Sequence, residues 1–338
     1  MSRGILVADM QEGQRLEGVY LVQSRTLATT RAGKPFLTLK LGDRSGVTEG
    51  RVWDDAEKVL QTITDYDYVR VAAQVNLYNG KLQLNLKSVK PVDAESVEPS
   101  DFLPASSRDP DEMMAELAAC IGKVKDKDFH KLLHTIFQDK ELKARFRRAP
   151  AAKSMHHAYV GGLLEHTLSL FHLCERVIPH FPEVDASLLL SGALLHDLGK
   201  VDELSYARSF DYTDEGRLMG HIVLELERVS RVIAGVPGFP EHKAVLLKHL
   251  LVSHHGKEEF GSPVKPMTME ALVLNVLDDL DAKSQAFRQL MASGSSERWS
   301  PYHPLLGQFV FKGYGRSESD GEGKKEPTGN DPDHPRLF

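Results

Sequence analysis

The pattern of hydrophobic and polar positions changes once along the chain and so divides it into two parts. From about residue 14 to residue 92, short apolar runs alternate with polar positions between glycine-containing turns, which predicts β-strands. Five strands are expected, with one short helix between the third and fourth strands and a final hairpin closed by Asn79-Gly80. This succession is typical of a small Greek-key barrel of the OB type.

From about residue 111 to residue 310, apolar residues recur instead at the spacing of an α-helix. The longest periodic segments lie near 163–178, 186–198, 220–235, 240–255 and 268–292. We therefore predict a multidomain protein in which a small β-barrel precedes an all-α domain. The predicted parts are an OB-fold domain over 1–92, a linker over 93–110, an all-α domain over 111–312 and a disordered tail over 313–338.

Composition narrows the classes of function only a little. The 338-residue chain has a formal net charge of −6, which argues against a protein that coats nucleic acid by charge alone. No apolar run is long enough to span a membrane or to serve as a secretory signal. The two cysteines, Cys120 and Cys174, do not indicate a disulfide framework, and their spacing is not that of metal ligands. We therefore expect a reducing, cytoplasmic setting.

Residues that could bind a metal or take part in catalysis are concentrated in the helical part. Five predicted helices there each place an imidazole or a carboxylate on an inward face. The residues concerned are His166, His196, Asp197, His221, His254, His255 and Asp278. Each alone could be a hydrogen-bonded core residue, and an ion pair with Lys200 would satisfy Asp197. Seven independent core roles, one for each residue, are together improbable. We therefore interpret the set as metal ligands. A set without thiolate suits Mn²⁺, Fe, Zn²⁺ or Ni²⁺ and does not choose among them.

Two further histidines lie off these inward faces. His172 is on the polar side of its predicted helix, and we expect it to be solvated. His249 falls off the apolar stripe that leads to His254, and we expect it to be structural.

The order His166, His196-Asp197, Asp278 resembles the H…HD…D signature of the HD superfamily of metal-dependent phosphohydrolases, and HDLGK matches the central motif of that superfamily. Finer matches resemble the YhaM-type 3′→5′ exoribonucleases, and they are HHAYVGGLLEHT, YTDEGRLMGHI, VSHHGKEEFGSPVKP and LDDLDAK. That family also carries an N-terminal OB domain, and FLTLKLGDRSGVTEGRVWD and YNGKLQLNL look like its strands. The resemblance therefore covers most of the chain.

The resemblance implies a centre with two metal ions. The first ion would be held by His166, His196, Asp197 and Asp278. The second would be held by His221, His254 and His255, with Asp197 bridging. Lys200 would lie beside the scissile phosphate, and His156 and His157 would lie behind the ligands. Manganese is the expected metal, with iron, zinc, nickel and magnesium as alternatives.

The implied reaction is hydrolysis of the 3′-terminal phosphodiester of single-stranded RNA, or of DNA, to nucleoside 5′-monophosphates by a metal-bound hydroxide. Asp197 and Lys200 are then the catalytic residues. One rival is an HD phosphohydrolase that acts on free or cyclic nucleotides, although the GYP tripeptide of the cyclic dinucleotide subgroup is absent. A second rival is a non-catalytic factor that binds nucleic acid through its OB domain alone.

The barrel would hold the nucleic acid. Phe36, Trp53 and Tyr78 are candidates for base stacking, worth roughly 1–3 kcal/mol per base, although aromatic residues in a small barrel more often belong to its core. Residues 1–95 contain 13 Lys and Arg against 12 Asp and Glu, so the electrostatic affinity is modest unless the charges are segregated. Basic residues near loops that could form a patch are Arg25, Arg31, Lys34, Arg44, Arg51 and Lys81. A homo-oligomer is compatible with the sequence, which does not fix the oligomeric state.

Overall fold

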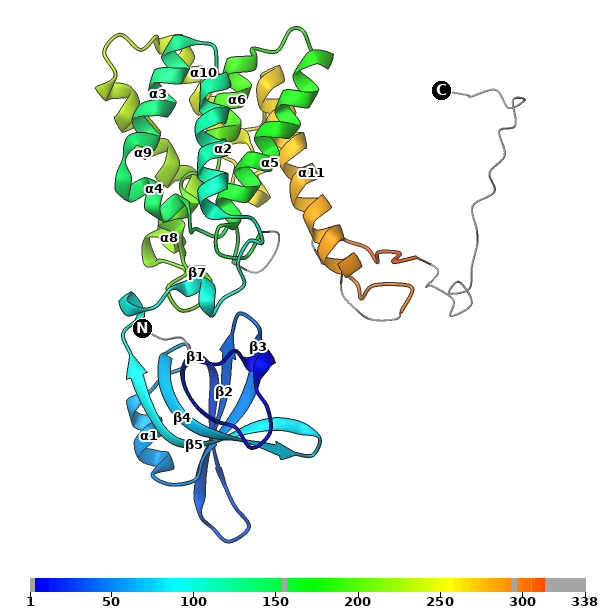
Figure 1. Ribbon diagram of the computed structural model, residues 1–338. Coiled ribbons are helices and arrows are strands. Elements are labelled where there is room, and N and C mark those ends of the chain that lie inside the picture. The colour runs from blue at the N-terminus through cyan, green and yellow to red at the C-terminus, as the bar shows by residue number, and fades with distance from the viewer. Residues whose placement is uncertain (1–3, 154–156, 293–296, 305, 314–338) are drawn as a thin grey trace, which may run out of the picture. The chain divides into compact units, whose positions relative to one another are not determined.

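The computed structural model describes residues 4–153, 157–292, 297–304 and 306–313 (Figure 1). The chain divides into two compact units, Met1–Ala282 and Lys283–Phe338. The boundary between the units falls inside the last helix, α11 (Met269–Ala292). Among the helices in the described ranges, none is both long enough and apolar enough to cross a membrane.

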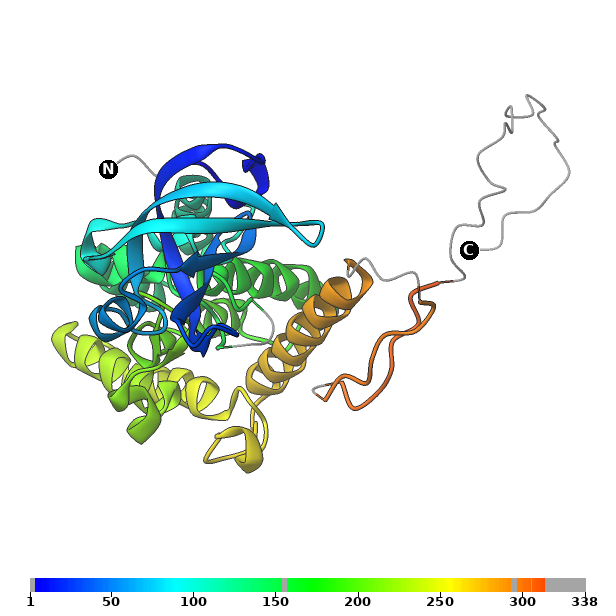
Figure 2. The same ribbon diagram turned by 90° about the horizontal axis from the view of Figure 1, so that it is seen from below.

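The N-terminal part of the first unit is a closed five-stranded barrel. Its strands follow one another in the spatial order β1-β2-β3-β5-β4, with β3 and β5 parallel and the other neighbours antiparallel. The first half of the long β1 pairs with β4 and its second half with β2 (Figure 2). The elements are η1 (Val7–Asp9), β1 (Arg15–Thr29), β2 (Pro35–Asp43), β3 (Gly46–Val52), α1 (Ala56–Thr62), β4 (Tyr68–Tyr78) and β5 (Lys81–Val92). Because α1 lies between the third and fourth strands, the OB-fold prediction is confirmed.

Alternation of side chains produces the barrel core. Leu37, Leu39 and Leu41 of β2 are fully buried, whereas the residues between them are not. The β4–β5 hairpin closes through Asn79 and Gly80, whose φ angles are 48° and 74°. Two consecutive left-handed residues form the tight turn that matches the twist of a hairpin, so the sequence signal at this position is confirmed.

The segment 93–110, which was predicted to be a linker, is packed against the barrel. Phe102 and Leu103 are buried in a cluster that includes Tyr68 and Val19 of the barrel strands. The polar composition of the segment suggested a free connection, but these two adjacent apolar residues give it a surface to bury.

The remainder of the first unit is helical, and it follows the predicted periodicity. Four of its helices begin at an aspartate that accepts hydrogen bonds from backbone N–H groups of the first turn, and these residues are Asp109, Asp126, Asp139 and Asp185. The elements between the barrel and α11 are η2 (Ala94–Ser96), η3 (Pro99–Asp101), α2 (Pro110–Lys123), α3 (Lys127–Gln138), α4 (Lys140–Phe146), α5 (Gly162–Val177), η4 (Ile178–His180), α6 (Ala186–Leu195), α7 (Lys200–Glu203), β6 (Leu204–Ser205), β7 (Asp211–Tyr212), α8 (Asp214–Met219), α9 (His221–Gly235), α10 (Glu241–Ser253) and η5 (Glu258–Phe260).

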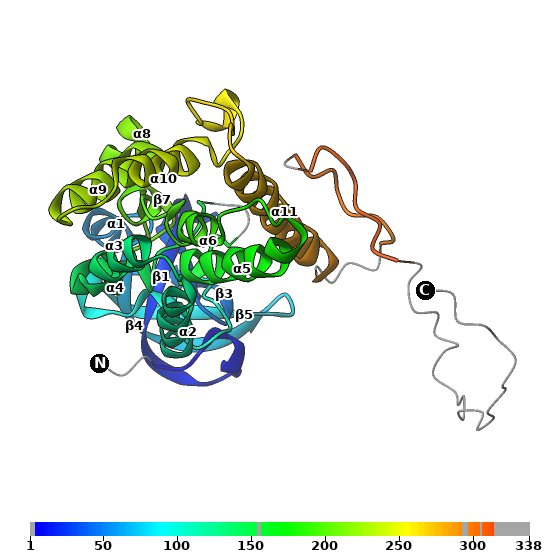
Figure 3. The same ribbon diagram turned by 90° about the horizontal axis from the view of Figure 1, so that it is seen from above.

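Helix α6 is at the centre of the helical part. Every residue from Ser187 to Leu195 is buried, because α6 packs against α3, α5 and α10 (Figure 3). A helix that is apolar on all sides is one that is surrounded by protein. Its C-terminal end therefore lies inside the domain, and that end carries His196 and Asp197.

Candidate metal centre

His196 and Asp197 directly follow the last turn of α6, and a nearby glycine allows another helix to begin beside them. A Cβ atom at Gly199 would lie only 2.0 Å from the carbonyl oxygen of His221. No side chain fits in that space, so the glycine of HDLGK permits the start of α9 to approach. This close packing of two backbones brings His221 toward Asp197.

The first group of predicted ligands comes from α5, the end of α6 and α11. The Nε2 atoms of His166 and His196 lie 3.1 Å apart, and Nε2 of His166 lies 3.1 Å from Oδ1 of Asp278. The Oδ2 atom of Asp197 lies 3.3 Å from Nε2 of His196 and 3.5 Å from Nε2 of His166. Four ligand atoms therefore surround one small volume.

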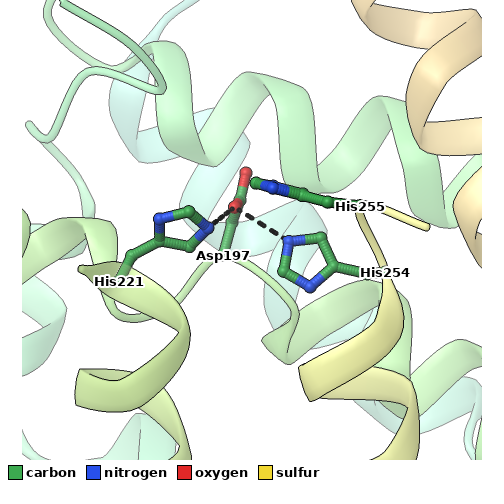
Figure 4. Close-up of side chains that lie close together, drawn as sticks. All are labelled: Asp197, His221, His254 and His255. Atoms are coloured by element: carbon green, nitrogen blue, oxygen red, sulfur yellow. Dashed lines mark ion pairs between the residues drawn. The ribbon is translucent and has the colours of Figure 1, made fainter. Parts of the chain in front are cut away.

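The second group meets the other oxygen of Asp197. The Oδ1 atom lies 3.6 Å from Nε2 of His221 and 3.8 Å from Nε2 of His254 (Figure 4). With His255 included, one ligand atom from each of the four residues lies within 4.8 Å of the others. The seven predicted ligands thus form two groups that share Asp197, each through a different oxygen.

All five histidine rings use Nδ1 to bind an atom outside the two groups. The acceptors are the Asp281 carboxylate for His166, the Ala193 carbonyl for His196, the Glu203 carboxylate for His221, the Leu251 carbonyl for His254 and the Phe260 carbonyl for His255, at 2.5–3.1 Å. A neutral imidazole that donates from Nδ1 has a lone pair on Nε2. In four of the rings this Nε2 is the atom that faces the aspartates.

Lone pairs and carboxylate oxygens at these separations repel one another unless a cation lies among them. Ligands about 2.0–2.2 Å from an ion are about 3.0–3.5 Å from one another. Four distances in the first group are 3.1–3.5 Å, and Nε2 of His196 lies 3.8 Å from Oδ1 of Asp278. In the second group, Oδ1 of Asp197 and Nε2 of His221 and His254 are buried and have no hydrogen-bond partner among the described residues. The donor atoms and their spacing therefore fit divalent metal ions.

The electrostatics of the centre separate its aspartates from its histidines. Burial acts to raise the pKa of Asp197, but Lys200, whose Nζ lies 2.7 Å from Oδ2, and His196 hold that pKa well below its usual range. Burial acts in the same way on Asp278, whose hydrogen bond with His166 keeps its pKa low. Burial acts to lower the pKa of His166, yet Asp278 and Asp281 raise it to about 10. The two carboxylates therefore favour a proton on the His166 ring, which a metal would have to displace.

One side of the centre is accessible to solvent. The side chains of the two histidines in the first group have no exposed surface. In contrast, the side chains of Asp278, His221 and Lys200 retain 16%, 12% and 11% of their surface. His255 is also only half-buried, so it shares this accessible edge with the other three residues.

Two buried carboxylates behind the rings were not predicted as site residues. Asp281 binds His166 and lies on α11 one turn after Asp278, so its spacing was a usable signal. Glu203 binds His221 and lies where α7 meets a short strand, and no periodic pattern marks it.

Of the two histidines expected behind the ligands, His156 lies outside the described residues. His157 is buried and has a φ of 51°. Its Nε2 lies 3.3 Å from Oδ2 of Asp281, and its Nδ1 lies 2.7 Å from the Tyr159 hydroxyl. His157 therefore contacts the carboxylate that binds His166.

The barrel brings four of its five predicted binding residues together. The rings of Phe36 and Trp53 are stacked with centroids 5.0 Å apart. The guanidinium group of Arg51 lies 5.2–5.8 Å from the ring centroids of Phe36, Trp53 and Tyr78. Lys81 pairs with Tyr78 across the β4–β5 hairpin. We call Phe36, Arg51, Trp53 and Tyr78 the aromatic cluster.

Arg44 is not brought to the aromatic cluster. It lies in the turn where the β2–β3 register ends at Asp43 and Gly46, whereas Phe36 and Trp53 lie at the opposite end of this hairpin. The side chain of Arg25, another basic residue of the predicted patch, donates a hydrogen bond to the Leu60 carbonyl at the end of α1.

His172, which was expected to be solvated, is partly exposed and also contacts two carboxylates. Its side chain is 39% exposed, but Nε2 lies 2.6 Å from a carboxylate oxygen of Glu116 and Nδ1 lies 3.0 Å from one of Glu175. The polar face of α5 that carries His172 packs beside α2, which supplies Glu116. His249 accepts a hydrogen bond from the backbone N–H of Met267, in keeping with a structural role.

The fold and the site together define a class of protein: an OB barrel followed by a helical, metal-binding domain of the HD type. Residues 21–92 match the OB-fold nucleic acid binding domain, and residues 163–283 match the HD domain. The 3′-5′ exoribonuclease YhaM of Bacillus subtilis is 37% identical over 284 residues, which are 84% of this chain and 89% of the relative. The YhaM exoribonuclease of Bacillus velezensis is 35% identical over 302 residues, which are 89% and 93% of the two chains. The chain belongs to the YhaM family of 3′-5′ exoribonucleases.

Among solved structures, the second OB-fold domain of replication protein A from Methanococcus maripaludis is similar to part of this chain. The match covers 28% of this chain and 98% of the solved chain. The two are 14% identical, with a TM-score of 0.23.

Proposed function

We propose that this chain is a metal-dependent 3′→5′ exoribonuclease that hydrolyses single-stranded RNA to nucleoside 5′-monophosphates. Its family supports the polarity and the class of reaction. The observation that carries the proposal is the arrangement of two ligand groups around the two oxygens of Asp197. The OB barrel supports a polymer rather than a free nucleotide as the substrate.

The centre would hold two divalent ions, and manganese is the expected metal. The first would be held by His166, His196, Asp197 and Asp278. The second would be held by Asp197, His221, His254 and His255. When bound, such ions lower the pKa of water and stabilise negative charge on the attacking and leaving oxygens. Iron, zinc and nickel suit the same nitrogen and oxygen donors.

The protein holds these ligands in place before a substrate binds. Each histidine ring is fixed by its Nδ1 hydrogen bond, so no ring has to rotate during the reaction. Preorganised groups of this kind stabilise developing charge without a cost of reorganisation during the reaction. Asp197 is the residue on which both groups depend, because it is the only ligand shared between them among the described residues.

Lys200 would neutralise charge on the substrate. Its ammonium group lies 2.7 Å from Oδ2 of Asp197, and its side chain reaches the accessible edge of the centre. When a metal takes part of the charge of Asp197, the ammonium group is able to bind a phosphoryl oxygen at this edge.

The aromatic cluster would hold the RNA by stacking. Three rings and a guanidinium group lie together on the barrel, and Tyr78 is 53% exposed. Every base has a face that can stack, so this kind of surface binds single strands with little sequence preference. A surface pocket that adjoins the cluster is lined by Arg51, Tyr78, Lys81 and Gln83, and also by Glu49, which pairs with Arg51 and accepts a hydrogen bond from Gln83. Its basic groups, Arg51 and Lys81, would contact the backbone of the strand.

The test is a digestion of single-stranded RNA labelled at its 5′ end by metal-stripped protein, with and without added Mn²⁺. A ladder that shortens from the 3′ end only when the metal is present is the expected result. Single-stranded DNA of the same sequence, tested in parallel, measures the preference between the two polymers.

Two other outcomes distinguish the rival functions. RNA that is bound but not cut would favour a factor that uses only its OB barrel. RNA that is neither bound nor cut, together with release of phosphate from free or cyclic nucleotides, would favour a different HD phosphohydrolase.

Three sequence-based expectations belong to the same proposal. They are the domain limits 1–92 and 111–312, a cytoplasmic location and a chain that is compatible with a homo-oligomer. Both cysteines are free and buried, which is compatible with a reducing compartment. The tail after residue 313 lies outside the described residues.

A further inference from the structure

We propose that Asp281 and Glu203 are positioning residues, and that each sets the metal affinity of one ligand group. This inference rests on the proposed two-ion centre. Three of the five ring Nδ1 atoms donate to main-chain carbonyl oxygens, whereas the other two donate to these carboxylates. One of the two rings is His166 of the first group, and the other is His221 of the second.

Asp281 is fixed from both sides. It is 4% exposed, and its Oδ2 accepts a hydrogen bond from Nδ1 of His166 at 2.8 Å. The same oxygen lies 3.3 Å from Nε2 of His157, and Oδ1 accepts a hydrogen bond from the Ser169 hydroxyl at 2.5 Å. Because His157 and Ser169 also contact the carboxylate, it can hold the His166 ring in one orientation.

This contact should increase the affinity of the first group for metal. A carboxylate that accepts the Nδ1 proton directs Nε2 of the ring toward the ion and makes that nitrogen a stronger donor. In this chain, Nε2 of His166 then points at Asp278 and His196. Loss of the carboxylate charge should therefore weaken the first ion.

Glu203 performs the corresponding role in the second group by a different route. Its Oε1 accepts hydrogen bonds both from the backbone N–H and from Nδ1 of His221, each at 3.1 Å. His221 is the first residue of α9, so one oxygen binds the start of the helix and the ring that the helix carries. Glu203 is 8% exposed, and its position thus fixes His221 relative to Asp197.

The two carboxylates should act separately. Among the ligands in the described part of the chain, Asp281 bonds a ring of the first group, and Glu203 bonds a ring of the second. A substitution at one of them should therefore change the binding of one ion and leave the other ion almost unaffected.

The experiment is calorimetric titration of Mn²⁺ into the metal-stripped full chain. Asp281→Asn and Glu203→Gln should each weaken one of two binding events by about 10–100-fold, which is the usual effect of removing such a partner. Asp279→Asn and Glu227→Gln are the matched controls, because both change an exposed carboxylate on the same or the neighbouring helix. Both controls should bind as the wild type does.

Two backgrounds assign each effect to a group. Asp278→Asn disables the first group, and His254→Ala disables the second. Asp281→Asn should weaken the remaining ion only in the His254→Ala background, and Glu203→Gln only in the Asp278→Asn background. Equal weakening in both backgrounds would show that the carboxylates support the fold in general and would overturn the inference.

The outcomes separate this inference from the proposed function. A wild-type chain that binds fewer than two ions contradicts the two-ion centre itself. A wild-type chain that binds two ions, with Asp281→Asn and Glu203→Gln indistinguishable from their controls, contradicts only the positioning roles. If Asp281→Asn does not fold, Ser169→Ala tests the same point, because it removes one donor that holds Asp281. It should weaken the first ion several-fold, and unchanged affinity would count against the proposal.

Discussion

The metal centre and the aromatic cluster differ in how their side chains are held. The histidines of the centre are fixed by hydrogen bonds, and four of its seven candidate ligands are buried. The residues of the aromatic cluster lie on the barrel surface and are joined by ring stacking and by the guanidinium group of Arg51. Buried charges depend on all of their partners, whereas exposed stacking contacts contribute one by one. We therefore expect substitution of a ligand of the centre to act nearly all-or-none, and substitution of a single residue on the barrel to act gradually.

Asp197→Asn should produce the largest effect and the sharpest contrast. It removes the charge shared by both ligand groups and leaves Lys200 beside them without its carboxylate. Metal content, measured by mass spectrometry, should fall to background, and RNA hydrolysis should fall by well over about 100-fold, more than the loss of an outer partner causes. Binding of single-stranded RNA should stay close to that of the wild type, because the barrel is unchanged. Hydrolysis at the control level of Asp279→Asn would refute the assignment of the centre.

Gly199→Ala should come next, although it changes no ligand. The added Cβ would lie 2.0 Å from the His221 carbonyl oxygen, so the start of α9 must move away from Asp197. Overpacking of this kind typically costs about 1–3 kcal/mol of stability. We expect a lower midpoint of thermal unfolding and selective weakening of the second ion in a Mn²⁺ titration. Gly235→Ala on α9, where a Cβ would meet no atom within 4 Å, is the matched control. A chain that unfolds as the control does, with two ions bound normally, would show that the backbone tolerates the methyl group.

Trp53→Ala tests the other side of the comparison. The loss of one stacking contact is worth about 1–3 kcal/mol, which corresponds to roughly a 5–150-fold weaker affinity for single-stranded RNA. The Michaelis constant for a long RNA should rise accordingly, while the turnover of a dinucleotide and the metal content should not change. Leu77→Ala, which removes an exposed apolar side chain outside the aromatic cluster, is the control. Unchanged RNA affinity in Trp53→Ala would exclude the aromatic cluster as the binding surface.

The metal affinity of the first ligand group should depend on pH more strongly than that of the second. Asp278 and Asp281 raise the pKa of His166 to about 10, so near neutral pH a metal must displace a proton from this ring. The affinity of the first group for metal should then rise about tenfold per pH unit as the pH increases toward that pKa. Burial lowers the pKa of His254, so its ring is already neutral and releases no proton. Calorimetry in buffers of different ionisation enthalpy measures the protons released, and RNA binding by metal-free protein should not change over the same interval.

The sequence was sufficient to predict the barrel and the main helices, whereas the division of the candidate ligands into two groups came from the family resemblance and stays a prediction. Periodicity was informative because a histidine or an aspartate on an apolar face, such as His166 or Asp278, has to be buried when the helix packs. Asp281 repeats this pattern one turn after Asp278, and its partner could have been inferred from the same helix face.

Other contacts could not be read from the sequence, because they depend on tertiary packing. Glu203 meets His221 only because Gly199 lets α9 begin close by. Arg51 lies among three aromatic rings because β3 pairs with β2, which carries Phe36, and with β5, which a tight turn joins to Tyr78 at the end of β4. The same holds for the expected linker. That Phe102 and Leu103 are buried can be seen only from their packing against the folded barrel.

His172→Gln should produce the smallest effect, and it separates the histidines of the centre from a histidine that only pairs with surface carboxylates. The ring lies between Glu116 and Glu175, is 39% exposed and makes no contact with either ligand group among the described residues. Exposed ion pairs usually contribute about 0–1 kcal/mol, because solvent screens the charges. Metal content, RNA affinity and hydrolysis should therefore match the wild type, and the midpoint of thermal unfolding should fall by only a few degrees. A loss of metal in this variant would mean that the histidines of this chain cannot be divided by burial into ligands and surface residues. Such a result would remove the basis for contrasting the two regions.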